Sequence, residues 1–98
     1  MADLERGEKI MLSPAEGTWF FGRKLLDSLG RRNLVVDKGD ELGHVDYYRV
    51  YAEDIIDKER TAVEAPYRAF VKEVFTPHGE YVRAGTPLLL MKALYEPD

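Results

Sequence analysis

The chain resembles itself, because the same short motifs occur in the same order in its two halves. Each half has a small residue followed by proline, a second small residue three positions later, an apolar run, and a glycine followed by an acidic residue. These motifs are Ser13-Pro14, Gly17 and Gly39-Asp40 in the first half, and Ala65-Pro66, Ala69 and Gly79-Glu80 in the second. Glycine supplies tight turns and proline ends a ladder at a sheet edge, so each half predicts a few short strands. Such strands cannot bury both faces alone, and two halves related by an approximate two-fold axis can cover each other.

The two halves differ in the length of one segment. Gly17 to Gly39 spans 22 residues and Ala69 to Gly79 spans 10, so the first half carries 12 more. The extra residues coincide with 23–32, where leucines recur at a spacing of three to four and predict a short helix. The first half is therefore expected to be the second half plus a helical insertion.

Short runs of β-branched and aromatic residues, separated by turn signals, predict strands along the rest of the chain. The expected strands are residues 10–12, 18–21, 34–36, 45–51, 61–64, 70–75, 81–82 and 88–94. This pattern predicts an all-β sandwich or barrel. The 98 residues have the size of one small domain, in which 1–9 are expected to be a flexible N-terminus and 10–98 a single folded unit.

Composition narrows the classes of function. The net charge of −4 argues against nucleic-acid binding, and the lack of cysteine excludes disulfides and thiolate chemistry. The two histidines, His44 and His78, lie near turn glycines and are expected to be solvated, so no metal site is predicted. No apolar run approaches the roughly 20 residues of a membrane span, which predicts a cytoplasmic protein that does not bind membranes. Neither a phosphate-binding loop nor a nucleophile motif is present, and we expect no catalytic activity from the domain itself.

The second half, residues 63–91, is similar to the recurring half of biotinyl/lipoyl carrier domains. That pattern consists of Ala-Pro, a small residue, an apolar strand, two glycines with an apolar residue between them, and Pro-Leu. Here it is Ala65-Pro66, Ala69, residues 70–75, Gly79, Val82, Gly85 and Pro87-Leu88. The first half, MLSPAEGTWFF followed by VVDKGDELG, resembles biotin carboxyl carrier proteins, and the whole resemblance covers about residues 10 to 95.

The resemblance implies a flattened barrel-sandwich hybrid of two quasi-repeated halves, with two four-stranded sheets. In this family a lysine at the tip of the central hairpin carries biotin or lipoate, and the cofactor swings between active sites. The chain would then be a small carrier-type subunit of a multienzyme complex, of the carboxylase or acyl-transfer kind. Its partners would be the larger enzyme subunits of that complex.

The central hairpin departs from the family pattern. The biotin motif Glu-Ala-Met-Lys-Met is absent, and the segment reads AEDIIDKERTAVEAP. Lys58 stands eight residues before Pro66, which matches the lipoyl-type spacing and makes Lys58 the candidate attachment lysine. Counted from Gly39, however, the arm is a few residues too long. Two hypotheses stay open: Lys58 carries biotin or lipoate, or the domain carries no cofactor and is a structural subunit that assembles partner enzymes.

A basic segment and a group of aromatic residues are candidates for partner binding. The aromatic residues would form an interface patch if alternate ones face outward, and they are Trp19, Phe20, Phe21, Tyr47, Tyr48 and Tyr51. The segment FGRKLLDSLGRR places four cations beside an apolar stripe in an acidic protein. Either it is a helix packed on the barrel with its charges in solvent, or it docks onto an acidic partner surface. The candidate partner-binding residues are Arg23, Lys24, Arg31, Arg32, Trp19 and Phe20.

Overall fold

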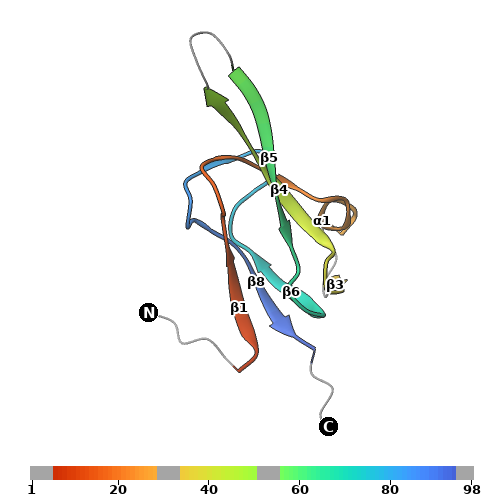
Figure 1. Ribbon diagram of the computed structural model, residues 1–98. Helices are drawn as coiled ribbons and strands as arrows, with labels where there is room; N and C mark the ends of the chain where they lie inside the picture. Colours follow the sequence, from red (N-terminus) through yellow and green to blue (C-terminus); the bar gives the residue numbers. More distant parts are fainter. Residues whose placement is uncertain (1–5, 29–33, 51–55, 95–98) are drawn as a thin grey trace.

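Eight strands form two four-stranded sheets in the computed structural model, which describes residues 6–28, 34–50 and 56–94 (Figure 1). The elements are β1 (Glu8–Leu12), β2 (Gly17–Phe21), α1 (Arg23–Asp27), β3 (Leu34–Val36), β4 (Glu41–Val50), β5 (Ile56–Glu64), β6 (Ala69–Val74), β7 (Tyr81–Val82) and β8 (Pro87–Ala93). All strand pairs are antiparallel, and the sheets have the orders β1-β8-β6-β3 and β5-β4-β2-β7. The prediction of an all-β, two-sheet fold with a short helix in the first half is confirmed.

The sheet orders confirm the internal repeat. Strands β1 to β4 make the first half of the chain, and β5 to β8 make the second. Under the repeat, β1 corresponds to β5, β2 to β6, β3 to β7 and β4 to β8. Replacing each strand of the order β1-β8-β6-β3 by its counterpart gives β5-β4-β2-β7, which is the order of the second sheet. Each sheet therefore contains strands of both halves, and the halves cover each other.

The register between the halves differs from the sequence prediction, because Gly39 corresponds to Gly85 and not to Gly79. In each half, the turn glycine and the residue after it share two backbone hydrogen bonds with the residue before proline of the other half. These bonds are Gly39 N to Ala65 O (2.8 Å), Ala65 N to Asp40 O (2.9 Å), Gly85 N to Ser13 O (2.8 Å) and Ser13 N to Thr86 O (2.8 Å). The turn side chains correspond as well, since Asp40 Oδ2 accepts from Asp37 N as Thr86 Oγ1 accepts from Arg83 N.

The sequence comparison chose the wrong glycine because the chain contains a third turn of the same kind. Gly39, Gly79 and Gly85 have φ angles of 88°, 88° and 87°, which suit the third position of a type II turn. The turn of Gly79 lies in the connection after β6, and its Gly-acid pair imitates Gly39-Asp40. Ala69 to Gly85 spans 16 residues, so the insertion in the first half has six residues and not 12.

The core lies between the two sheets and is made by alternate strand residues. The largest fully buried side chains are Trp19, Leu42, Leu88, Leu89, Met91, Val36 and Val45. Along β2 the residues alternate between buried and half-buried positions, which places Trp19 in the core and Phe20 on the outer face. The prediction that Trp19 forms part of a partner-binding surface is therefore wrong, because its side chain is 0% exposed.

The N-terminal strand begins earlier than predicted. Glu8 and Lys9 pair with Lys92 and Met91 in the β1–β8 ladder, so these two residues belong to the sheet and not to a flexible segment. Residues 1–5 lie outside the described part of the chain.

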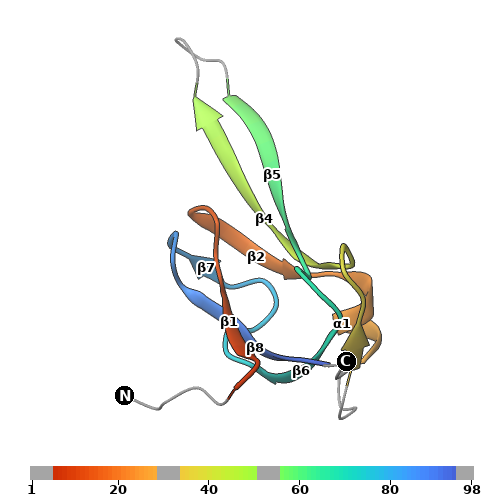
Figure 2. The ribbon, with the colours of Figure 1, turned by 60° about the horizontal axis from the view of Figure 1, so that its bottom comes forward.

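The central hairpin, β4 and β5, is longer than its counterpart in the repeat, β8 and β1. Its register runs from Glu41 opposite Glu64 to Val50 opposite Ile56. Under the repeat, the residues of β8 correspond to residues 41–47 of β4, and those of β1 correspond to residues 60–64 of β5. The hairpin extension therefore consists of residues 48–50 and 56–59, which extend beyond the other strands in Figure 2.

Candidate partner-binding site on the central hairpin

Lys58 lies within strand β5, directly opposite Tyr48 of β4. The family resemblance predicted the attachment lysine at the tip of the hairpin, whereas β5 already begins at Ile56. A regular ladder continues to the pair of Val50 and Ile56. Lys58 therefore lies in the paired part of the hairpin, called the stalk below, and not at its tip. The connecting residues, 51–55, lie outside the described part of the chain, and their sequence, YAEDI, contains no lysine.

The ammonium group of Lys58 lies beside the carboxylate of Asp46, on the outer face of the sheet. Lys58 Nζ is 3.4 Å from Asp46 Oδ2, and Arg60 Nε donates to Asp46 Oδ1 at 3.1 Å. His44 Nε2 lies 3.6 Å from the same Oδ1. The Asp46 side chain is only 9% exposed, while those of Lys58 and Arg60 are 60% and 59% exposed. One covered carboxylate thus holds two cations, whose side chains remain open to solvent.

These neighbours decide the ionisation of Asp46. Burial alone would raise the pKa of its carboxyl group, but the hydrogen bond from Arg60, the nearby His44 and the hydrogen bond from Lys58 outweigh burial and lower the pKa below its ordinary 3.8. The charged form is therefore more favourable in the folded than in the unfolded state. Its contribution to stability is present above the unfolded pKa and is lost as the pH falls through the lower folded pKa.

Asp46→Asn is expected to lower the free energy of unfolding at neutral pH by about 1 kcal/mol, because the cations lose their shared carboxylate and both are largely exposed. Urea denaturation between about pH 3 and pH 7 checks this. The difference from the wild type should shrink toward acid pH. Asp57→Asn, on the opposite face of the same hairpin, is the control, and an equal effect there would contradict the role of Asp46.

An apolar strip continues this outer face toward the end of the hairpin. Tyr48 and Val50 follow Asp46 at intervals of two, and Ile56 lies opposite Val50, so all three share the face of Asp46. Their exposed fractions are 71%, 68% and 61%, the three highest among the large hydrophobic side chains of the described residues. Tyr48 belongs to the aromatic residues that the sequence analysis considered for an interface patch, whereas Val50 and Ile56 were missed, although the alternation in VDYYRV was a signal for Val50. Exposed apolar side chains on a sheet face are typical of interaction sites.

The predicted basic patch is described only in part. Arg23 and Lys24 are exposed on α1, and Lys24 forms an ion pair with Asp40 of the turn before β4. The hydrogen bond from Lys24 lowers the pKa of Asp40. Arg31 and Arg32 lie outside the described ranges. Lys24 thus helps to attach the helix to the barrel, which is the packing alternative of the sequence analysis.

Phe20 lies on the outer face of the sheet but between two histidine rings. Its ring centroid is 5.4 Å from that of His44 and 5.4 Å from that of His78. His78 also accepts a hydrogen bond from the backbone N–H of Phe21 through Nδ1 at 2.8 Å. His78 is exposed in the 77–80 turn, as predicted, and its hydrogen bond also fixes this turn against β2. Phe20 is half-covered.

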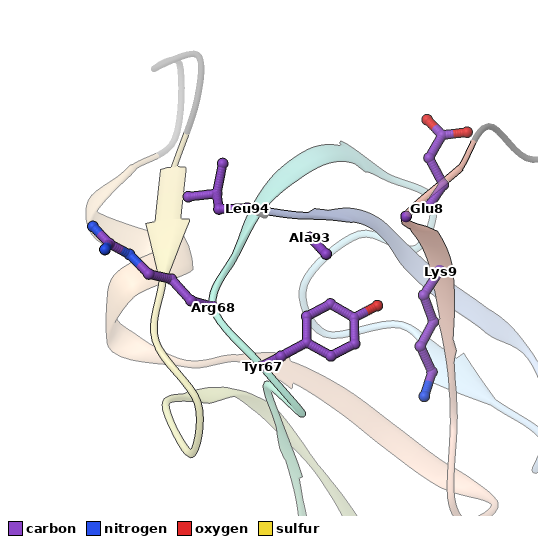
Figure 3. A pocket seen from close by; sticks show the side chains of 7 residues that line it. Glu8, Lys9, Tyr67, Arg68, Ala93 and Leu94 are labelled. Atoms are coloured by element: carbon purple, nitrogen blue, oxygen red, sulfur yellow. The ribbon is translucent and has the colours of Figure 1, made fainter. Parts of the chain in front are cut away.

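A separate cavity of about 500 Å³ opens at the other end of the barrel, between the start of β1 and the end of β8 (Figure 3). Two charged side chains in its lining are paired, Glu8 with Lys72 and Arg68 with Asp37. Lys9 and Tyr67 provide polar groups, and Ala93 and Leu94 provide apolar surface. In the ranges that the structure describes, no three side chains come together as a metal site, and no helix could cross a membrane.

Comparison with solved structures finds a similar fold in part of a larger protein. The chain is similar to part of a protein described as a single-chain, multi-domain long-chain acyl-CoA carboxylase, with a TM-score of 0.66 and 18% identity. The match covers 96% of this chain and 8% of the carboxylase chain. No description of a known protein family matches the sequence, and no curated protein matches it either. The comparison shows that a multi-domain carboxylase contains a domain of this fold.

Proposed function

We propose that this chain is a carrier-derived interaction domain, which joins a multienzyme assembly of the carboxylase kind by docking its central hairpin onto a larger subunit. The observation that carries this proposal is the hairpin extension with Tyr48, Val50 and Ile56 exposed on one face. A ladder holds these side chains in place before binding, so little conformational entropy is lost on docking. The similarity of the fold to part of a multi-domain carboxylase supports the choice of assembly.

The double substitution Tyr48→Ser and Val50→Ser tests the docking. In an extract of the native host, the wild-type domain is expected to elute in a large complex during size-exclusion chromatography, and the variant as the free domain. The substituted side chains are 71% and 68% exposed, so the fold should be retained, which circular dichroism checks. Val35→Ser, at a 42% exposed position on β3, is the control and should elute with the complex. Elution of the double variant with the complex would contradict docking through the hairpin.

A second candidate function is that of a carrier with biotin or lipoate on Lys58. Its support is the position of Lys58 on the central hairpin, with a side chain that is 60% exposed. Against it, the ε-amino group pairs with Asp46 and projects from a strand, whereas a ligase must take the lysine into its own active site. The proposed function thus corresponds to the second hypothesis of the sequence analysis, in which the domain carries no cofactor and assembles partner enzymes.

Intact-mass spectrometry of the domain purified from its native host separates the two functions. We expect the mass of the unmodified chain, because no lysine stands in the connection of the hairpin and Lys58 is held in the stalk. The same host must contain a biotinylated or lipoylated protein, as a check that its ligases are active. A mass increase that Lys58→Arg abolishes would establish the carrier function instead.

A further inference from the structure

The outer face of the hairpin extension combines apolar surface with an excess of positive charge. Lys58 and Arg60 lie on the same face as Tyr48, Val50 and Ile56, since cross-strand pairs and residues two apart share a face. Both cations share the carboxylate of Asp46, which is itself nearly covered. Among the described residues of β4 and β5 on this face, Asp46, Lys58 and Arg60 together carry one net positive charge, in a protein whose net charge is −4.

The acidic residues of the hairpin extension, Asp57 and Glu59, lie on its other face. Asp57 and Glu59 alternate with Lys58 along β5, and Glu59 pairs with Arg49 at 3.6 Å. A partner on the outer face thus meets the apolar strip and the cations, and is separated from these two carboxylates by the backbone.

This arrangement selects among possible partners. A second copy of the chain, packed with the same face, would bring Lys58 and Arg60 against their own counterparts, and like charges oppose such an interface. A nucleic acid would satisfy the cations but leave the apolar strip in water. Carboxylates on a protein surface can approach the exposed sides of Lys58 and Arg60, while apolar neighbours cover the strip.

We propose that the outer face of the hairpin extension binds a protein surface on which exposed apolar side chains lie beside carboxylates. This inference rests on the proposed docking function and adds the chemistry of the partner. Apolar contact supplies the buried centre of the interface, and the ion pairs fix its orientation and speed its formation.

The partner is identified first, by a photo-crosslinking amino acid at Val50 in the full chain, expressed in the native host. The same group at Val35, an exposed position on the other sheet, is the control. A protein that crosslinks from Val50 and not from Val35 is expected, and the crosslinked peptide should contain Asp or Glu beside apolar residues. Equal labelling from both positions would refute the docking function itself.

Binding of the purified partner then tests its chemistry. Lys58→Glu and Ile56→Ser are each expected to weaken the Kd about tenfold or more, because one opposes the carboxylates and the other removes apolar contact. Lys38→Glu, an exposed cation on a turn, should leave the Kd within about twofold. Wild-type binding should weaken as NaCl rises from about 50 to about 300 mM, because salt screens the ion pairs.

The outcomes distinguish the two proposals. If the partner crosslinks from Val50 but binds Lys58→Glu as tightly as the wild type, the acidic partner surface is refuted while docking through the hairpin stands. A crosslink to a second copy of the chain or to nucleic acid would likewise refute the acidic protein surface. Circular dichroism of each variant establishes that a loss of binding does not come from a loss of folding.

Discussion

Trp19→Ala is expected to lower the free energy of unfolding by about 4 kcal/mol, the largest loss that a single truncation should cause in this domain. Trp19 is fully buried and pairs with Val45 across the β2–β4 ladder. Its removal leaves a cavity that the two hydrogen-bonded sheets cannot close. A domain of this size is stabilised by only about 5–15 kcal/mol, so the variant should be near the limit of folding. Urea denaturation followed by circular dichroism measures the change.

Tyr48→Ala is the matched control for Trp19→Ala, because it truncates another aromatic strand residue that is 71% exposed. Its effect on stability should stay within about 0.5 kcal/mol. The pair also separates two interpretations of the aromatic residues. A small effect of Trp19→Ala on stability together with a loss of partner binding would return Trp19 to the interaction surface that the sequence predicted.

Gly43→Ala is expected to destabilise the domain by about 3 kcal/mol, through overpacking. A Cβ atom at Gly43 would lie 2.4 Å from Trp19 Cη2 and 2.4 Å from the backbone oxygen of Phe20. Neither neighbour can move easily, since Trp19 fills the core and Phe20 belongs to the β2–β4 ladder. Thermal or urea denaturation of the purified variant measures the loss.

Gly39→Ala provides the comparison, because Gly39 has a positive φ of 88° and nothing within 4 Å of the added Cβ. Its loss should be limited to the conformational penalty of about 1 kcal/mol. If both variants lose the same free energy, the close approach of Trp19 to the backbone of Gly43 is not what requires glycine there. In a Trp19→Leu background, Gly43→Ala should lower the free energy of unfolding by less than it does in the wild type. The part of the loss that comes from the oxygen of Phe20 should remain.

Much of the fold was predictable, because it depends on short-range signals that recur. Strand β3 and strand β7 begin and end at the predicted residues, and the small-Pro motifs mark the ends of β1 and β5. The register of the repeat was not predictable from glycines alone, since three turns share one conformation. The hydrogen bonds of Ser13 and Ala65, and those that the side chains of Asp40 and Thr86 accept, distinguish Gly85 from Gly79.

The candidate site was predictable only in its location. Family spacing led to the central hairpin, but it placed Lys58 at a tip, whereas β4 and β5 continue their ladder past Lys58. Which aromatic residues face outward depends on the register of Trp19 with Val45, so the sequence could not show that Trp19 is buried and Tyr48 exposed. The shared carboxylate of Asp46 depends on pairing across β4 and β5 and leaves no motif in the sequence.

The interleaving of the two halves determines when the chain can fold during its synthesis on the ribosome. Strand β8 follows all the other described strands in the sequence and lies between β1 and β6 in its sheet, so the preceding strands cannot complete that sheet without it. The nascent N-terminal half must wait with apolar side chains such as Trp19 and Val36 uncovered. Folding then pairs β1 with β8, strands far apart in the sequence, and such a topology favours slow folding.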